Sequence, residues 1–277
     1  MRYFKAFHPG MICNGKQYAE NTVYEENGNT ICEKGVMHFC ETPFDCLDYY
    51  PLINESGRIT EFAEVTPMDV VLKEENKRAC RKLHIGAKLS LKDVINAQVD
   101  IQMEKGACDT AASGYESQLA ASGNWSQLAA SDDESQLAAS DDESQLAASG
   151  NRSKLAASGY GSQLAASGNG SQLAASGYGS KLAASGYGSQ LAASGNGSRI
   201  AASGNGSRIA ASGAHSIAAA IGRNSAASAS LGSWIVLAEF NSDGKPICVK
   251  AAQIDGEKLK PNVFYKLNGG EFVEASE

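Results

Sequence analysis

The chain has 277 residues and a formal net charge of −7 at pH 7, from 24 Lys and Arg against 31 Asp and Glu. This acidic balance excludes the basic surface with which proteins hold nucleic-acid backbones, so we expect no such binding. No run of about eighteen apolar residues is present, so we expect no membrane-spanning helix and no membrane partner.

The N-terminal segment and the cysteine content indicate the cellular compartment of the protein. The N-terminal segment begins with basic residues but reaches His8 and Pro9 before any apolar stretch, which argues against a secretory signal. The seven cysteines, an odd number in a chain of this size, do not resemble a disulfide framework and fit a reducing environment. We therefore expect a cytoplasmic protein.

Residues 1–106 have the composition of an ordinary α+β domain. The stretches that we expect to form strands or turns are residues 2–7, 59–66 and 78–85 and the Asn14-Gly15 turn. Ser90 and Asp93 are spaced as a capping pair and predict a helix from there to about Glu104. An apolar stripe on that helix would let it cap the first coil of the repeat region that follows.

Cysteine and histidine residues in this domain raise two chemical hypotheses. Cys13, Cys32, His38 and Cys40 include the ligand types of a tetrahedral zinc site, but their spacing matches no common zinc module. Cys is also among the residue types most often buried, so we favour core residues and expect no metal. A nucleophilic pair of Cys40 and His38 lacks an identifiable acid or oxyanion partner, so we assign no catalytic residue and no cofactor.

This domain resembles an uncharacterised N-terminal domain of phage, prophage and bacterial repeat proteins. The resemblance is carried by Cys13 to Tyr18, by Cys32 to Pro43 with its Gly-Val-Met-His-Phe-Cys-Glu-Thr-Pro segment, by Leu47 to Tyr50 and by Phe62 to Val65. Val36 and Met37 stand where the family usually has one Phe. The resemblance covers about residues 1–100, with similar segments near 232–239, and such domains often precede a Ser/Ala/Gly repeat. It implies a phage or prophage origin, and hence a bacterial host cytoplasm, and supplies no activity.

From about Cys108 the sequence repeats every nine residues, with the unit Ser-(Gln/Lys/Arg)-(Leu/Ile)-Ala-Ala-Ser-Gly-(Asn/Tyr)-Gly. One slot of the unit always holds a large aliphatic residue. Its occupants are Leu119, Leu128, Leu137, Leu146, Leu155, Leu164, Leu173, Leu182, Leu191, Ile200 and Ile209. Strand alternation places this slot on one face, and a unit so short must stack on its neighbours to bury it.

The expected fold is therefore mainly β. We predict a parallel β-solenoid of about 18 residues per coil over 107–230, between the α+β domain at 1–106 and a small β cap at 231–277. A flexible Ser/Gly-rich linker is the alternative, but the fixed aliphatic slot and strict register oppose it. Calcium binding is not expected, because Gln, Lys or Arg stands where the calcium β-roll has its ligand Asp.

The predicted cap consists of two strand pairs. Residues 234–240 and 247–251 form the first, and a second pair surrounds Asn268-Gly269-Gly270. These strands would cover the end of the solenoid, whose unpaired backbone groups otherwise invite aggregation.

Two successive turns of the repeat depart from its pattern. They read Asp132-Asp133-Glu134 and Asp141-Asp142-Glu143, and Trp125 lies in the turn before them. One hypothesis is an acidic patch of these seven residues that binds a basic protein surface or a divalent cation; the other is that the charges are merely solvated. In an 18-residue coil the two turns fall on opposite edges, which weakens a single metal site. We interpret Tyr160, Tyr178 and Tyr187 as packing within their turns.

These observations favour a non-enzymatic interaction or scaffold protein over an enzyme, because no motif for nucleotide, phosphate or hydride chemistry is present. The rod would present a surface to a host or phage protein. The phage setting suggests an inhibitor of a host defence complex, or an acidic mimic of nucleic acid. The alternative is an enzyme in the Cys/His-containing N-terminal domain. The sequence leaves the partner, the handedness of the solenoid and the oligomeric state open.

Overall fold

The structure is a computed structural model that describes residues 2–28, 35–54, 58–74, 77–104, 111–112 and 114–275. The chain divides into two compact units. The N-terminal unit comprises Met1–Asn54 and Ile59–Gln98, and the solenoid unit comprises Glu55–Arg58 and Val99–Glu277. Each unit is described by itself.

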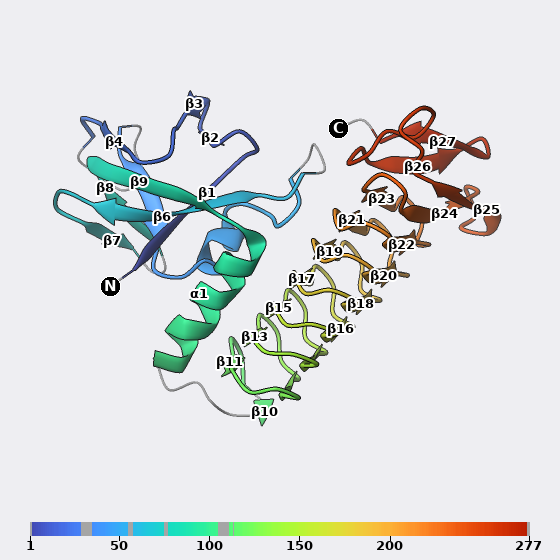
Figure 1. Ribbon diagram of the computed structural model, residues 1–277, viewed down its shortest axis with the longest axis horizontal. Helices are drawn as coiled ribbons and strands as arrows, with labels where there is room; N and C mark the ends of the chain where they lie inside the picture. The colour runs from blue at the N-terminus through green and yellow to red at the C-terminus, as the bar shows by residue number, and fades with distance from the viewer. Residues whose placement is uncertain are drawn as a thin grey trace. The chain divides into compact units, whose positions relative to one another are not determined.

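The N-terminal unit is built around an antiparallel sheet with the strand order β4-β9-β6-β1-β5-β8-β7 (Figure 1). The sheet strands are β1 (Tyr3–Phe7), β4 (Thr22–Glu25), β5 (Met37–Cys40), β6 (Glu61–Pro67), β7 (Leu72–Glu74), β8 (Lys77–Cys80) and β9 (Lys82–Leu89). The remaining elements are the hairpin β2 (Ile12–Cys13) and β3 (Lys16–Gln17), the 3-10 helix η1 (Asp45–Asp48) and the helix α1 (Leu91–Glu104).

The central strand β1 is held unequally by its two neighbours. It pairs with β6 over five residues, from Tyr3↔Val65 to Phe7↔Glu61, but meets β5 at the single pair Phe4↔Cys40. One core cluster of this unit lies on the sheet and includes the buried side chains of Phe7, Met37, Phe39, Leu83 and Ile85. The two strands β1 and β5 therefore separate beyond one pair.

The local signals in this unit are mostly confirmed. Asn14 and Gly15 both adopt positive φ in the turn between β2 and β3, as a two-residue hairpin turn requires. At the start of α1, the backbone N–H of Asp93 donates to Ser90 Oγ at 3.2 Å, and that of Ser90 donates to the Asp93 carboxylate at 3.1 Å. The single strand expected at 78–85 is wrong, because the chain bends at Arg81 and β8 and β9 join different parts of the sheet.

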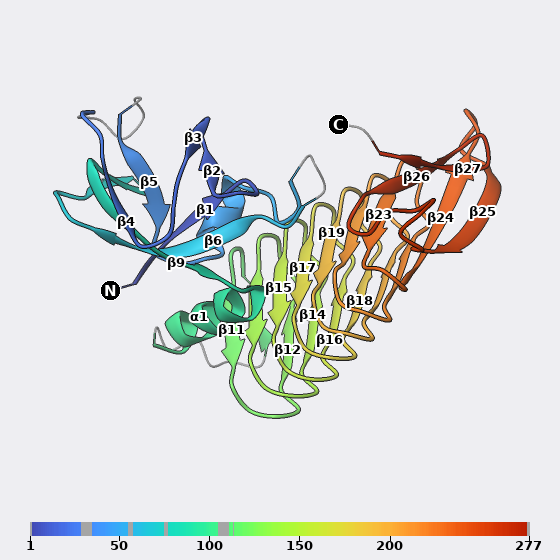
Figure 2. The ribbon, with the colours of Figure 1, turned by 45° about the horizontal axis from the view of Figure 1, so that its top comes forward.

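The predicted parallel β-solenoid is confirmed, with about seven coils of about 18 residues between residues 118 and 237 (Figure 2). The even sheet contains β10 (Ala111–Ala112), β12 (Gln127–Ala130), β14 (Gln145–Ala148), β16 (Gln163–Ala166), β18 (Lys181–Ala184), β20 (Arg199–Ala202), β22 (Ile217–Ala220), β24 (Trp234–Phe240) and β25 (Pro246–Gln253). The odd sheet contains β11 (Gln118–Ala121), β13 (Gln136–Ala139), β15 (Lys154–Ala157), β17 (Gln172–Ala175), β19 (Gln190–Ala193), β21 (Arg208–Ala211), β23 (Ala226–Ala229), β26 (Tyr265–Asn268) and β27 (Glu271–Glu274).

The core between the two sheets is made of stacked identical slots. Leu119 pairs with Leu137, which pairs with Leu155, and the even sheet repeats the pattern from Leu128 onward. All eleven large aliphatic residues of the repeat are buried in one cluster, together with the second Ala of each strand from β12 to β21. Serines preceding the strands are also buried, and their hydroxyls donate to the carbonyl three residues earlier, as Ser153 does to Gly150 at 2.8 Å. The interior therefore buries no unpaired hydroxyl at these positions.

A C-terminal strand pair ends each sheet, but the two pairs join the repeat strands in opposite directions. In the even sheet β24 pairs in parallel with β22 and turns back as the antiparallel strand β25. In the odd sheet β26 pairs antiparallel with β23 at Ala227↔Tyr265 and turns back as β27 through Gly269-Gly270. Ile254, Leu259 and Leu267 of this region belong to the same buried cluster as the repeat.

The helix α1 contributes to the solenoid unit through its C-terminal part. Val99 packs against Ala120 of β11 and Ala138 of β13, two residues that face away from the solenoid core. The solenoid unit thus begins with a contact between Val99 and the outer surface of the odd sheet. Within the described residues, no helix is both long and apolar enough to span a bilayer.

Candidate functional site

Each coil of the solenoid has two turns, and these form two edges. The Trp125 edge consists of the turns that follow odd-sheet strands and carries Trp125, Asp141, Asp142, Glu143, Tyr160 and Tyr178. The Glu134 edge consists of the turns that follow even-sheet strands and carries Tyr115, Asp132, Asp133, Glu134, Arg152 and Tyr187. The two acidic turns therefore lie on opposite edges, as an 18-residue coil predicts, and the six carboxylates do not form one patch.

The last turn residue before each strand-preceding serine has a left-handed backbone. Its N–H donates to a carbonyl of the next coil, as Trp125 does to Asp142 at 3.0 Å. Glycine fills this position in the middle coils, but Glu116, Trp125, Glu134, Glu143 and Arg152 fill it in the first five described turns, with φ between 55° and 65°. A side chain in this conformation costs roughly 1–2 kcal/mol relative to the right-handed one. The first turns therefore have larger side chains at a position where the backbone geometry favours glycine.

Acidic and aromatic side chains alternate along the Trp125 edge. The Asp142 carboxylate accepts a hydrogen bond of 2.7 Å from the backbone N–H of Tyr160. The ring of Tyr160 stacks on that of Tyr178, with centroids 5.5 Å apart and an interplanar angle of 7°. Trp125 is 65% exposed and both tyrosines are more than half exposed. These two tyrosines therefore pack between successive turns, and not only within their own turns as expected, and the outer surface of the pair stays open.

On the Glu134 edge one carboxylate of the acidic turn has a cationic neighbour. Glu134 forms an ion pair with Arg152 of the next coil. A hydrogen bond to Glu134 also raises the pKa of the Tyr115 phenol. Asp133 accepts a hydrogen bond of 2.7 Å from the backbone N–H of Asn151. One of the three carboxylates of this acidic turn, that of Glu134, is therefore paired with a cation within the solenoid.

The Trp125 edge differs in this respect. Among the residues that the structure describes, Asp141, Asp142 and Glu143 form no ion pair with a Lys, Arg or His. Their charge, beside the exposed indole of Trp125, remains available to a partner. Of the expected seven-residue patch, four members share this edge.

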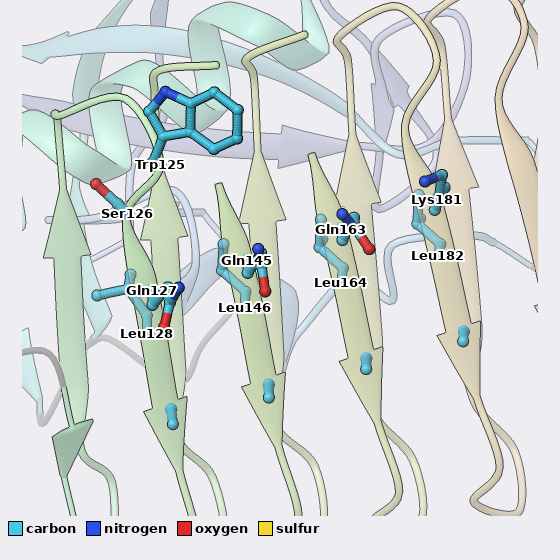
Figure 3. A pocket seen from close by; sticks show the side chains of 14 residues that line it. Trp125, Ser126, Gln127, Leu128, Gln145, Leu146, Gln163, Leu164, Lys181 and Leu182 are labelled. Atoms are coloured by element: carbon cyan, nitrogen blue, oxygen red, sulfur yellow. The ribbon is translucent and has the colours of Figure 1, made fainter. Parts of the chain in front are cut away.

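A shallow groove runs from this edge across the outer face of the even sheet. Trp125 is in the turn before β12 and stands beside the Gln127 end of the row Gln127, Gln145, Gln163 and Lys181, which crosses β12, β14, β16 and β18 (Figure 3). The groove has a volume of about 900 Å³, and a second hollow of about 630 Å³ lies over the neighbouring rows of alanine and serine. The small side chains beside this row leave the groove shallow.

The cysteine and histidine candidates of the N-terminal unit line a separate cavity of about 350 Å³. Cys13, His38 and Cys40 are on its wall, whereas Cys32 lies outside the described residues. The Cys13 thiol is 2.9 Å from the Tyr50 hydroxyl. No cluster of three or more potential metal ligands occurs among the described residues.

The comparisons with known proteins bear on the N-terminal part alone. Residues 1–97 match a family described as a domain of unknown function (DUF7666). Neither the curated proteins nor the solved structures contain a match to the chain. The match supports an uncharacterised N-terminal domain of about the expected extent, and no enzyme family is identified.

Proposed function

We propose that this protein is a non-enzymatic β-solenoid scaffold that docks a basic protein partner on the Trp125 edge. The observation that carries the proposal is the exposed Trp125 held at φ 65°, a position that the middle coils give to glycine. Strained residues concentrate where function retains them. Tryptophan and tyrosine are also the residues most enriched among the energetic centres of protein interfaces.

The negative charge of the residues beside Trp125 supports the proposal that the partner is basic. The carboxylates of Asp141, Asp142 and Glu143 are next to Trp125 and lack an ion pair within the described residues. The chain as a whole carries a net charge of −7. Complementary charge at the rim of an interface mainly accelerates encounter, while buried aromatic contacts hold the complex together.

The origin and setting of the scaffold form a finer part of the proposal. We place the protein in the cytoplasm of a bacterial host, as a phage- or prophage-derived inhibitor of a host defence complex. This part is supported by the sequence resemblance of the N-terminal domain. An acidic surface of this kind would act by occupying a site that otherwise holds nucleic acid.

The competing hypothesis of an enzyme in the N-terminal unit needs an activated nucleophile. The thiol of Cys46, which lines the cavity with Cys40, instead has its pKa raised by a hydrogen bond with Cys40 and by burial. Such a thiol remains protonated and unreactive at neutral pH. We therefore prefer the scaffold.

The test compares two matched triple variants. Asp141→Gly, Asp142→Asn and Glu143→Gly restore the ordinary repeat on the Trp125 edge, while Asp132→Gly, Asp133→Asn and Glu134→Gly do so on the opposite edge. Partners captured from a bacterial lysate are purified and their binding kinetics are measured at two salt concentrations. We expect association to slow by about tenfold and to lose salt dependence for the first variant alone.

A third variant, Trp125→Gly, tests the aromatic contribution. Glycine suits the left-handed turn, so the fold is retained, and we expect faster dissociation. Equal kinetics for wild type, both triple variants and Trp125→Gly would reject the Trp125 edge as the docking surface.

A further inference from the structure

The N-terminal cavity contains a buried cation whose hydrogen-bonding capacity is only partly used. Lys5 is 3% exposed, and its ammonium donates to the carbonyl oxygen of His38 at 2.8 Å. An ammonium has three donors, and in the described part of the chain no carboxylate pairs with this one. The ammonium also lies 5.5 Å from the ring centre of Phe7 and 5.7 Å from that of Tyr18.

The position of Lys5 follows from the strand pairing. Because β1 and β5 share only the pair Phe4↔Cys40, the two strands separate beside it, and the Lys5 ammonium reaches across to the His38 carbonyl of β5. The lysine occupies this gap and forms part of the cavity wall. Burying a charge in this way is expensive unless a partner of opposite charge completes the site.

The cavity wall is positive and rich in donors. Its buried part includes Lys5, Cys40 and Cys46, and its more exposed part includes His8 and Lys77. The remaining lining residues are Ala6, Cys13, Asn14, His38, Phe39, Tyr49 and Tyr50, so no Asp or Glu lines the cavity.

The ionisable groups nearby do not cancel this positive charge. Burial and a hydrogen bond with Cys13 hold the pKa of Tyr50 far above its ordinary value, and the Cys46 thiol is likewise held protonated. The carboxylate of Asp45 acts on Cys46 but does not line the cavity. The Lys77 ammonium lies 5.4 Å from the ring centre of Tyr49, toward the outside.

We propose that this cavity binds a small ligand bearing an oxyanion, with the oxyanion on the Lys5 ammonium and Lys77 and His8 at the entrance. A volume of about 350 Å³ lies within the range of small-molecule sites. Phosphate esters and carboxylates share the required chemistry, and the phenol of Tyr50 and amide of Asn14 supply further neutral donors. This binding site is independent of the solenoid surface proposed above.

The test is a titration of the full chain, in which binding is monitored by backbone amide chemical shifts and by calorimetry. The probes are inorganic phosphate, phenyl phosphate, benzoate and, at matched ionic strength, chloride. We expect saturable shifts in residues 5–14, 38–50 and 77 with an oxyanion probe and none with chloride. A phosphate preference over benzoate identifies the phosphate-bearing class, and the reverse identifies the carboxylate class.

Variants distinguish binding in the cavity from a general effect of salt on the protein. Lys5→Met keeps the length of the side chain without its charge, and we expect at least about tenfold weaker binding with equal or higher thermal stability. Lys77→Met, at the exposed end, should weaken binding by about two- to fivefold. Lys73→Ala, an exposed lysine of β7 outside the cavity, is the control and should bind as wild type does.

Three results would overturn the proposal. They are the absence of saturable shifts with every oxyanion probe, shifts that map elsewhere, and affinities that Lys5→Met and Lys77→Met leave unchanged. If Lys5→Met does not fold, the Lys77→Met and Lys73→Ala comparison decides.

Discussion

The carboxylate of Asp142 accepts the backbone N–H of Tyr160, exactly one coil further along, at 2.7 Å. The same relationship joins Asn151 to Asn169 at 2.9 Å and Asn169 to Tyr187 at 2.8 Å. A side-chain carbonyl at this turn position thus extends the hydrogen-bond ladder beyond the strands. The Asp residues at 133 and 142 perform what Asn performs elsewhere in the array.

This relationship predicts that the acceptor matters more than the charge for folding. Asp142→Asn should leave the free energy of unfolding within about 0.5 kcal/mol of wild type. Asp142→Ala removes the acceptor and should lower it by about 1 kcal/mol. Urea denaturation followed by circular dichroism measures both values, and equal loss in the two variants would contradict the ladder.

Two glycines of one turn should respond very differently to the same substitution. An added Cβ at Gly177 would lie 1.8 Å from the carbonyl oxygen of Gly159, so Gly177→Ala must displace the neighbouring coil. At Gly179, with φ +70°, no atom lies within 4 Å of the added carbon. Gly179→Ala should therefore cost only the backbone strain of about 1–2 kcal/mol.

The measurement for this pair is the denaturation midpoint of each variant against wild type. We expect Gly177→Ala to be the more destabilised by a wide margin. Similar midpoints would mean that the coils are not stacked as closely at this turn as the structure shows.

The solenoid core predicts a sharp contrast between adjacent residues of β16. Leu164 is buried between the sheets, so Leu164→Asp places a charge in a thin core and should destabilise the protein by more than about 3 kcal/mol. Gln163 faces outward on the same strand, and Gln163→Asp should change stability by less than about 0.5 kcal/mol. Circular dichroism of the two variants, recorded together, tests the register directly: equal effects would place both side chains in the same environment.

Stability should fall at alkaline pH because of buried thiols. Burial raises the pKa of Cys80 from its ordinary 9.0 to about 11. Since the unfolded chain loses this proton first, the contribution is complete below about pH 9 and is lost as the pH rises toward 11. The expected observation is a decline of the urea midpoint across this interval that is shallower in Cys80→Ala.

Cys46, Tyr18 and Tyr50 also have raised pKa values, so Cys80→Ala should remove only part of the decline. Cys248→Ala is the control, because that thiol is only half-buried. A pH profile that is identical in wild type and Cys80→Ala would show that Cys80 titrates normally.

The sequence predicts the solenoid well because its register is local. The spacing from Leu119 to Leu137 is one coil, and those residues are partners in the odd sheet. The two acidic turns are nine residues apart, which is half a coil, so the sequence alone assigns them to opposite edges. The repeat period does not reveal that Glu134 forms an ion pair with Arg152, whereas Glu143 has no such partner among the described residues. This difference depends on which side chain each coil has at a single turn position.

The N-terminal unit could not be predicted to the same extent. Its sheet depends on distant pairs such as Tyr3↔Val65 and Met37↔Cys80, and no period in the sequence marks them. The cavity could not be predicted for the same reason, because a lysine within a strand is normally expected to be exposed. Lys5 is nevertheless buried, beside the single pair that joins β1 to β5, and only the assembled sheet displays this.

The use of two repeats per coil constrains how the gene for such an array can change in length. Loss or gain of a single nine-residue repeat would exchange the two sheets for every downstream strand and would deliver Trp234–Phe240, the strand that pairs with the last repeat strand of the even sheet, to the odd one. Loss or gain of two repeats preserves the parity of the array. Recombination among nearly identical units therefore yields viable proteins in steps of one whole coil, and its odd products should be eliminated by misfolding.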